Sequence, residues 1–213
     1  MNKERMAGYL ASLEPCSDEE LNSLRKEAVR DGVPIIRPET ESFLRTLLKI
    51  IKPARILEIG AATGYSSIAM AKSCEAKIET IENYEKRIPA ALSHIREAGL
   101  SDRITLIEGD AGEILKELSG PYDFVFLDAA KGQYLIWLPD ILHLMRPGSV
   151  LVTDNVLQDE TVMESRFAIP RRERTTHARM REFLFEIKHH PDLESSVLPV
   201  GDGVSLSVMT GEG

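Results

Sequence analysis

Acidic and amide side chains follow two hydrophobic segments that have the composition of buried strands. Asp128 ends the segment 122–128, and Asp154 and Asn155 end the one that starts at residue 148. If both segments are parallel strands of one sheet, their carboxyl ends share an edge, and three oxygen ligands converge there. Two carboxylates and an amide oxygen favour a hard cation, and Mg²⁺ fits best. Taken singly, each residue has an ordinary explanation as a helix cap or turn former.

A short turn between Gly60 and Gly64 connects the hydrophobic segment 55–59 to a helical pattern. Dinucleotide sites require a third glycine, which this turn lacks. Glu58, just before the turn, suits a cationic ligand without phosphate groups, which points to S-adenosylmethionine. Glu82 ends the next strand about 20 residues on, where an acid accepts hydrogen bonds from ribose hydroxyls. Glycine turns after strands also occur for packing alone.

Two sets of basic residues are candidates for chemistry. Lys131 follows Asp128 by three positions and is a candidate general base, although a lone lysine at a helix start is usually solvated. The segment 166–181 holds six arginines and one acid, Glu173. Such a basic patch in an acidic chain could bind phosphates, and a solvated helix face is the alternative explanation. The candidate phosphate-binding residues are Arg171, Arg172 and Arg174.

These residues are positioned by a predicted alternation of strands and helices, which indicates a parallel sheet with right-handed crossovers. The strands are expected at 55–59, 77–82, 103–108, 122–128 and 148–154, and the helices between them at 64–73, 84–98, 111–118 and 131–145. Three helices are expected before the sheet, at 3–13, 17–30 and 39–51, with Ser17 or Asp18 capping the second. After a helix at 171–190, strands 195–200 and 204–208 are expected to form an antiparallel hairpin with a three-residue loop, 201–203.

The composition bounds the class of protein. The 213 residues, 43% of them hydrophobic, can bury one core, so we expect a single domain, 1–213, with a helical cap at 1–52 and a core at 53–213. The 26 basic and 34 acidic residues give a net charge of −8, which argues against a generally basic nucleic-acid surface. Cys16 and Cys74 are too few for a disulfide framework or a zinc site. With no signal-peptide pattern or long hydrophobic run, the expected location is the cytoplasm.

Several motifs together resemble one enzyme family. ILEIGAATGYSSIAMA, TIENYEKR, EGDA at 108–111, FVFLDAAKGQY and LVTDNV occur here in the order and spacing of the Mg²⁺-dependent S-adenosylmethionine O-methyltransferases of the catechol and caffeoyl-CoA type. The resemblance implies an α/β Rossmann-like class I methyltransferase fold. That fold has a seven-stranded, mostly parallel sheet with a C-terminal antiparallel hairpin, here preceded by extra N-terminal helices. It also implies a homodimer.

The resemblance implies a role for each matching residue. The Ile36 backbone with Glu58, Gly60 and Ser66 would hold the methionine part of S-adenosylmethionine, and Glu82 would bind the ribose. Asp110 and Ala111 would border the adenine. The metal ligands would be Asp128, Asp154 and Asn155, and the general base Lys131. Asp128 would also contact the cofactor. The chain departs from the catechol enzymes at Ala129 and Ala130, where they carry bulkier residues.

A bidentate metal requires an acceptor with two neighbouring oxygens. Catechols provide them, and so does 5-hydroxyuridine. The motifs VPII at 33–36, DAAKGQY at 128–134, TDNVL at 153–157 and LPVGDG at 198–203, with the arginines, resemble bacterial tRNA 5-hydroxyuridine methyltransferases, which act at the wobble position. A tRNA substrate is therefore our first hypothesis. The alternatives are a methyltransferase for small catechols or hydroxycinnamoyl esters and, more remotely, a non-catalytic RNA-binding module.

Overall fold

A seven-stranded mixed sheet forms the centre of the computed structural model, which describes residues 3–13, 18–157 and 161–211. The strand order is β3-β2-β1-β4-β5-β7-β6, and β7 runs antiparallel to both of its neighbours. The predicted mostly parallel sheet with a C-terminal hairpin is thereby confirmed. The strands are β1 (Arg55–Ile59), β2 (Lys77–Glu82), β3 (Ile104–Glu108), β4 (Phe124–Leu127), β5 (Val150–Thr153), β6 (Leu193–Leu198) and β7 (Val204–Met209).

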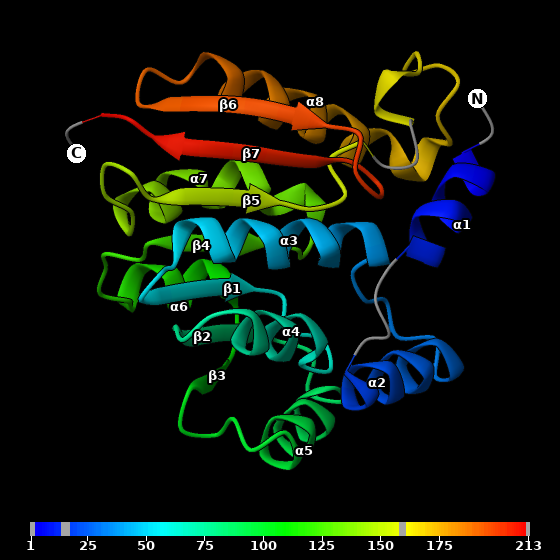
Figure 1. Ribbon diagram of the computed structural model, residues 1–213. Helices are drawn as coiled ribbons and strands as arrows, with labels where there is room; N and C mark the ends of the chain where they lie inside the picture. The colour runs from blue at the N-terminus through cyan, green and yellow to red at the C-terminus, as the bar shows by residue number, and fades with distance from the viewer. Residues whose placement is uncertain (1–2, 14–17, 158–160, 212–213) are drawn as a thin grey trace.

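Helices cover both faces of the sheet, as Figure 1 shows with α3 and α4 in front and α7 and α8 behind. They are α1 (Lys3–Leu13), α2 (Glu19–Arg30), α3 (Pro38–Ile51), α4 (Tyr65–Ser73), α5 (Ile88–Glu97), α6 (Ala111–Glu117), α7 (Tyr134–His143) and α8 (Arg174–His189), with the short 3₁₀ helices η1 (Lys131–Gln133), η2 (Thr161–Met163) and η3 (Arg171–Glu173). No helix within the described ranges is long and hydrophobic enough to cross a membrane.

Two hydrophobic cores result, one on each face, because successive side chains of a strand point in opposite directions. In β1, Ile56 packs in the core that contains Leu48 of α3, whereas Leu57 packs in the core that contains Phe183 of α8. Both faces of the central strands β1, β4 and β5 are buried, which explains their nearly continuous hydrophobic sequences, whereas the edge strand β3 is partly exposed. The same alternation fixes where a polar residue in these strands must point.

The C-terminal hairpin differs from the prediction in its loop. Leu198 pairs with Val204, so five residues, 199–203, connect the strands instead of three. The Gly203 amide donates to the Val200 carbonyl, 2.8 Å, so residues 200–203 form a turn that begins before the predicted loop 201–203. Asp202 is thereby placed at the carboxyl edge of the sheet, and its carbonyl accepts a bond from the amide of Leu157, 3.0 Å, after β5.

Two helix starts follow local capping chemistry. Asp18 caps α2, and its side chain accepts a bond from the Glu20 amide, 3.0 Å, which confirms one of the two predicted caps. Ser17, the other predicted cap, and Cys16 lie outside the described residues. α5 begins at Ile88 instead of residue 84, because Pro89 favours the first turn of a helix and residues before it form a turn.

Candidate active site

A cavity of about 480 Å³ opens at the carboxyl ends of β1, β2 and β4. Its walls are the segments 34–37, 59–62, 81–84 and 128–131. This is the point where the strand order reverses between β1 and β4, at which open α/β sheets bind ligands. Eight residues predicted to do chemistry line it, namely Ile36, Gly60, Ser66, Glu82, Ala111, Asp128, Lys131 and Asn155.

The glycine turn forms the floor of this cavity, with Gly60 at φ 108° and Gly64 at φ 83°. A Cβ atom on Gly60 would lie 2.0 Å from the carbonyl oxygen of Asp128. Glycine is therefore required at position 60 because the end of β4 passes directly against the turn, as well as for the positive φ. This contact explains the glycine without any close approach to a ligand. The contact links the turn to Asp128.

Glu82 anchors the turn from the end of β2. Its Oε2 accepts a bond from the amide of Ala62, 2.6 Å, and its Oε1 accepts bonds from the amides of Asn83 and Tyr84, 3.0 and 2.8 Å. The carboxylate is buried at the cavity wall. Three backbone donors fix its orientation, and Oε2, which accepts one of these bonds, keeps a second lone pair that could accept a ligand hydroxyl.

Glu58 lies behind the turn instead of lining the cavity. It shares a face of β1 with Ile56, so its side chain points towards α4. There Oε2 accepts bonds from the hydroxyls of Ser67 and of Thr80, the latter 2.5 Å. The side chain is fully buried, and this burial raises the pKa of Glu58. The carboxyl group supports the turn through α4 and does not form the ligand surface.

Asp110 is likewise absent from the cavity lining, whereas its neighbours Gly109 and Ala111 are part of it. The Asp110 side chain caps α6 and accepts a bond from the Gly112 amide, 2.8 Å. Capping occupies the carboxylate because the first amides of a helix need acceptors. The cap uses Oδ1, so a contact between Asp110 and a ligand would come from the backbone or from Oδ2.

The predicted acidic edge does assemble at the ends of β4 and β5. Asn155 Nδ2 donates to Asp128 Oδ1, 3.1 Å, and the Asn155 amide donates to Asp154 Oδ1, 2.8 Å. Asn155 has φ 60°, a left-handed conformation that asparagine tolerates better than most residues. Within the described ranges, no three His, Cys, Asp or Glu side chains gather as metal ligands. A metal held at this edge would need the Asn155 amide as its third protein ligand.

Burial and like charge both act on this edge. Burial raises the pKa of Asp128 and, together with the charge of Asp128, raises the pKa of Asp154 to about 7. The nearby charge of Lys131 acts in the opposite direction on both pKa values. Two carboxylates that resist ionisation side by side form a donor set that a divalent cation would satisfy, because the cation neutralises the repulsion.

Lys131 lines the cavity from η1, in a loop that is held at both ends. The Tyr134 hydroxyl exchanges bonds with the backbone amide and carbonyl of Ala129, 3.1 and 3.2 Å. Arg179 of α8 donates to the carbonyl of Gly132, 2.8 Å. Tyr134 is fully buried, as expected for a packing residue. The loop therefore holds Lys131 beside Asp128 through contacts from α7 and α8.

The arginines of 166–181 divide into two groups. Arg174, Arg179 and Arg181 donate to the backbone carbonyls of Ile169, Gly132 and Val162 at 3.0, 2.8 and 3.0 Å, so they hold neighbouring loops. In contrast, Arg166, Arg171 and Arg172 are exposed, as Arg181 also is, and Arg172 pairs with Glu173 at 3.0 Å. None of the three predicted phosphate-binding arginines is among the residues that line the cavity.

Sequence reasoning missed an ion pair at the cavity. Arg37 donates to Asp202 through Nε, 2.7 Å, and through Nη2, 2.6 Å, and both residues line the cavity. The pair joins the segment before α3 to the β6–β7 loop, 165 positions away. The sequence offered only the Gly-Asp-Gly turn as a signal. Tyr65 and Trp137 also line the cavity.

Comparison with known proteins places this geometry in a family. Residues 11–209 match the family model described as O-methyltransferase. The chain is 31% identical over 175 residues to a catechol O-methyltransferase of Niastella koreensis, covering 78% of this chain and 79% of the relative. It is 32% identical over 212 residues to caffeoyl-CoA O-methyltransferase 1 of Eucalyptus globulus, covering 92% and 83%.

Solved structures agree with this result. An O-methyltransferase from Bacillus cereus in complex with SAH superposes with a TM-score of 0.85 at 26% identity, covering 97% of both chains. TomG of Streptomyces achromogenes, in complex with SAM, gives a TM-score of 0.84 at 28% identity, covering 99% of this chain and 100% of TomG. Because the family model spans most of the sequence and the fold agrees throughout, the chain belongs to the O-methyltransferase family.

Proposed function

We propose that the protein is an S-adenosylmethionine- and Mg²⁺-dependent O-methyltransferase whose acceptor has two neighbouring oxygens. The observation that carries this proposal is that Asp128 and Asn155 line the same cavity as the glycine turn and Glu82. Asp154 is buried next to them, outside the cavity lining, and accepts a bond from the Asn155 amide. A methyl donor and a metal-bound acceptor oxygen must lie side by side for transfer. A cavity that has the glycine turn and Glu82 on one side and the acidic residues on another meets that requirement.

The cofactor assignments follow the cavity walls. Glu82 would accept bonds from the ribose hydroxyls, because its carboxylate is already oriented by backbone amides. The Ile36 backbone, Gly60 and Ser66 would hold the methionine part, and Ala111 would border the adenine. Glu58 and Asp110 would act indirectly, through α4 and the start of α6. S-adenosylmethionine supplies the electrophilic methyl group when bound.

The metal assignment rests on the chemistry of the donors. Asp128, Asp154 and the Asn155 amide provide oxygen ligands without sulfur or imidazole, a set that suits Mg²⁺ completed by water and acceptor. The raised pKa values of Asp128 and Asp154 fit a site that a cation completes. When bound, the ion would polarise an acceptor hydroxyl and make its proton easier to remove.

Lys131 is the proposed general base. It lines the cavity beside Asp128, so its neutral amine could accept the proton of the acceptor hydroxyl. The acceptor oxygen then forms a bond to the methyl carbon while the carbon–sulfur bond breaks and its electrons stay on sulfur. The products are the methyl ether, S-adenosylhomocysteine and a protonated Lys131. The enclosed walls would exclude water from the transfer.

For the acceptor we place 5-hydroxyuridine in tRNA first. The cavity wall next to the glycine turn includes the small Ala129 and Ala130, where the catechol enzymes carry bulkier residues, and this difference disfavours a small catechol. Outside the cavity, Phe167 is 86% exposed in the same segment as the exposed Arg166, Arg171 and Arg172. Exposed arginines with an aromatic side chain suit a single-stranded nucleic acid, through phosphate contacts and base stacking.

The second candidate is a small catechol or hydroxycinnamoyl ester, which the names of the relatives favour. One experiment separates the two. The protein is incubated with labelled S-adenosylmethionine, Mg²⁺ and either tRNA that carries 5-hydroxyuridine or a panel of catechols, and products are identified by mass spectrometry. We expect 5-methoxyuridine, whose formation stops when a chelator removes divalent metal. Methylated catechols without 5-methoxyuridine would favour the second candidate, and no methyl transfer to any acceptor would reject both.

We also propose a homodimer. Helix α1 exposes four large hydrophobic side chains, Met6, Tyr9, Leu10 and Leu13, on a short amphipathic segment at the edge of the molecule (Figure 1). Exposed hydrophobic patches of this kind mark association surfaces. Light scattering coupled to size exclusion should report twice the mass of one chain, 23.8 kDa. A monomer at micromolar concentration would contradict this assignment.

A further inference from the structure

Helix α2 lies outside the sheet and its covering helices, yet one of its side chains reaches two residues that line the cavity. Arg25 donates through Nη1 to the Ile36 carbonyl, 3.1 Å, and through Nε to the Tyr65 hydroxyl, 3.1 Å. Its third contact, from Nη2, is an ion pair with Glu41 of α3, 2.6 Å. The guanidinium carbon also lies 4.7 Å from the centre of the Tyr65 ring. Arg25 therefore joins α2 to the segment before α3 and to the start of α4.

The Arg25 contacts are largely shielded from water. The exposed fractions of the Arg25 and Glu41 side chains are 23% and 10%. Charge-assisted hydrogen bonds in such surroundings are stronger than exposed ones. Only a planar guanidinium can reach three acceptors in fixed directions, which a lysine ammonium cannot reproduce. Arg25 thus contacts both the Ile36 carbonyl and Tyr65 at one wall of the cavity, and the Tyr65 hydroxyl is held in addition by Glu41, to which it donates at 2.5 Å.

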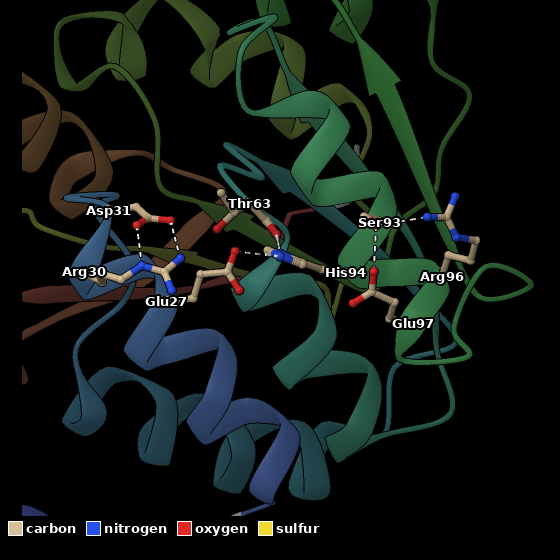
Figure 2. A network of polar contacts seen from close by, with 8 residues as sticks. All are labelled: Glu27, Arg30, Asp31, Thr63, Ser93, His94, Arg96 and Glu97. Atoms are coloured by element: carbon tan, nitrogen blue, oxygen red, sulfur yellow. Dashed lines mark hydrogen bonds and ion pairs between the residues drawn. The ribbon is translucent and has the colours of Figure 1, made fainter.

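A second contact from α2 reaches the glycine turn through His94, as Figure 2 shows. His94 of α5 lies with Nδ1 2.9 Å from the Thr63 carbonyl in the glycine turn and Nε2 3.4 Å from Glu27 Oε1. The His94 side chain is 11% exposed. Both partners are acceptors, so the ring bonds to both when both nitrogens carry hydrogen. His94 thus connects the turn to α2.

The other charged groups around His94 are paired with one another. On α2, Arg30 donates to the adjacent Asp31 at 2.7 and 2.9 Å. On α5, the Ser93 hydroxyl donates to Glu97 at 2.7 Å and accepts from Arg96 at 2.9 Å, on the side away from α2 (Figure 2). Glu27 is therefore the charged side chain that meets the His94 ring directly.

We propose that α2 braces the cavity from outside. Arg25 is the positioning residue for Ile36 and Tyr65. His94, paired with Glu27, is the positioning residue for the glycine turn. The inference rests on the proposed binding of S-adenosylmethionine in this cavity. None of these side chains is assigned contact with the reacting atoms. Their loss therefore weakens cofactor binding and leaves the rate at saturating cofactor close to that of the wild type.

The first test uses Arg25→Lys, which keeps a positive charge beside Glu41 and avoids leaving that buried carboxylate unpaired. Titration calorimetry with S-adenosylhomocysteine should show a Kd about fivefold to tenfold higher than for the wild type. The KM for S-adenosylmethionine should rise in parallel, with kcat within about twofold. Lys26→Gln is the matched control, because Lys26 is on the same helix and exposed. Its Kd should equal that of the wild type.

The second test compares two variants of His94. Asn places an amide donor where Nδ1 lies, so His94→Asn should keep the Thr63 bond and bind S-adenosylhomocysteine within about twofold of the wild type. His94→Phe removes both contacts and should raise the Kd about fivefold. Rescue by Asn distinguishes positioning of the turn from simple filling of space, since Phe fills the site better than Asn does.

The outcomes separate the brace from the proposed function. If the wild type binds S-adenosylhomocysteine and both Arg25→Lys and His94→Phe bind it equally well, the brace is wrong, whatever their melting temperatures. If the Asn and Phe variants of His94 bind equally weakly, the Thr63 contact is not what positions the turn. If the wild type binds no S-adenosylhomocysteine, the cofactor assignment fails and the brace fails with it.

Discussion

The two halves of the sheet's carboxyl edge, at β1–β2 and at β4–β5, differ in how their acidic side chains are stabilised. On the β1–β2 side, the Glu82 carboxylate accepts three backbone amides and the glycine turn is fixed by internal hydrogen bonds. On the β4–β5 side, Asp128 and Asp154 are buried together, burial raises the pKa values of both, and the charge of Asp128 further raises the pKa of Asp154. The first half is already hydrogen-bonded within the protein, whereas in the second half a bound cation would relieve the repulsion. Under the proposed function, preorganised hydrogen bonds would favour cofactor binding and the repulsion between carboxylates would favour metal binding.

The largest effect should come from removing one acid of the second half. Asp154→Asn should lower kcat/KM by roughly 10³-fold or more, because the metal loses a charged ligand. The same substitution should raise the melting temperature of the metal-free protein, since a buried repulsive carboxylate is gone. Activity assays and thermal unfolding in chelator check both. If activity is lost but the metal-free melting temperature falls, the Asp154 carboxylate does not destabilise the metal-free protein by repulsion.

A somewhat smaller effect is expected for Lys131, the proposed general base. Lys131→Ala should lower kcat by roughly 10²- to 10³-fold, within the range usual for general acid–base catalysis, while the Kd for S-adenosylhomocysteine changes little. Steady-state kinetics and calorimetry on the same preparation measure this split. Lys116→Ala, on the exposed surface of α6, is the matched control. Unchanged turnover in Lys131→Ala would exclude this residue from the reaction.

The first half is tested by Glu82→Gln. The amide can still accept from Asn83 and Tyr84, but its NH₂ group would face the amide of Ala62, so the turn loses one anchor. The Kd for S-adenosylhomocysteine should rise roughly tenfold to a hundredfold, as expected for charge-assisted bonds. Mg²⁺ affinity should stay unchanged. If metal and cofactor affinities fell together, the two halves would not be separable.

The smallest expected effect is on the pH dependence of metal binding. The pKa of Asp154 is raised to about 7, so below that pH protons compete with the metal. Mg²⁺ affinity should therefore fall roughly eightfold from about pH 7.5 to about pH 6. In the metal-free protein the sign is opposite: the carboxyl is best accommodated when neutral, so its contribution is present at acid pH and is lost as pH rises through about 7.

Isothermal titration of Mg²⁺ at several pH values, in buffers of different ionisation enthalpy, measures both the affinity and the protons released. Thermal unfolding of wild type against Asp154→Asn in chelator isolates the stability effect of this one group. Flat metal affinity across this range would mean that Asp154 is already ionised in the folded protein.

The sequence alone determined the architecture and the edge at which the site lies. Alternating hydrophobic and helical patterns specify parallel strands, and parallel strands bring Gly60, Glu82, Asp128 and Asp154 to one edge whatever the details of packing. The hairpin was also predictable. The length of its loop was not, because the hydrogen bond from Gly203 to Val200 makes residues 200–203 a turn and strand pairing ends at Leu198.

Only the tertiary structure decided how those residues are used. Glu58 points to α4 because of strand alternation and the packing of Ser67, and Gly60 is needed because the Asp128 carbonyl passes against it. Arg25 and the Arg37–Asp202 pair reach the cavity from distant parts of the chain. Patterns of neighbouring residues encode direction and periodicity, whereas contacts between remote side chains depend on the packed fold and leave no local signal.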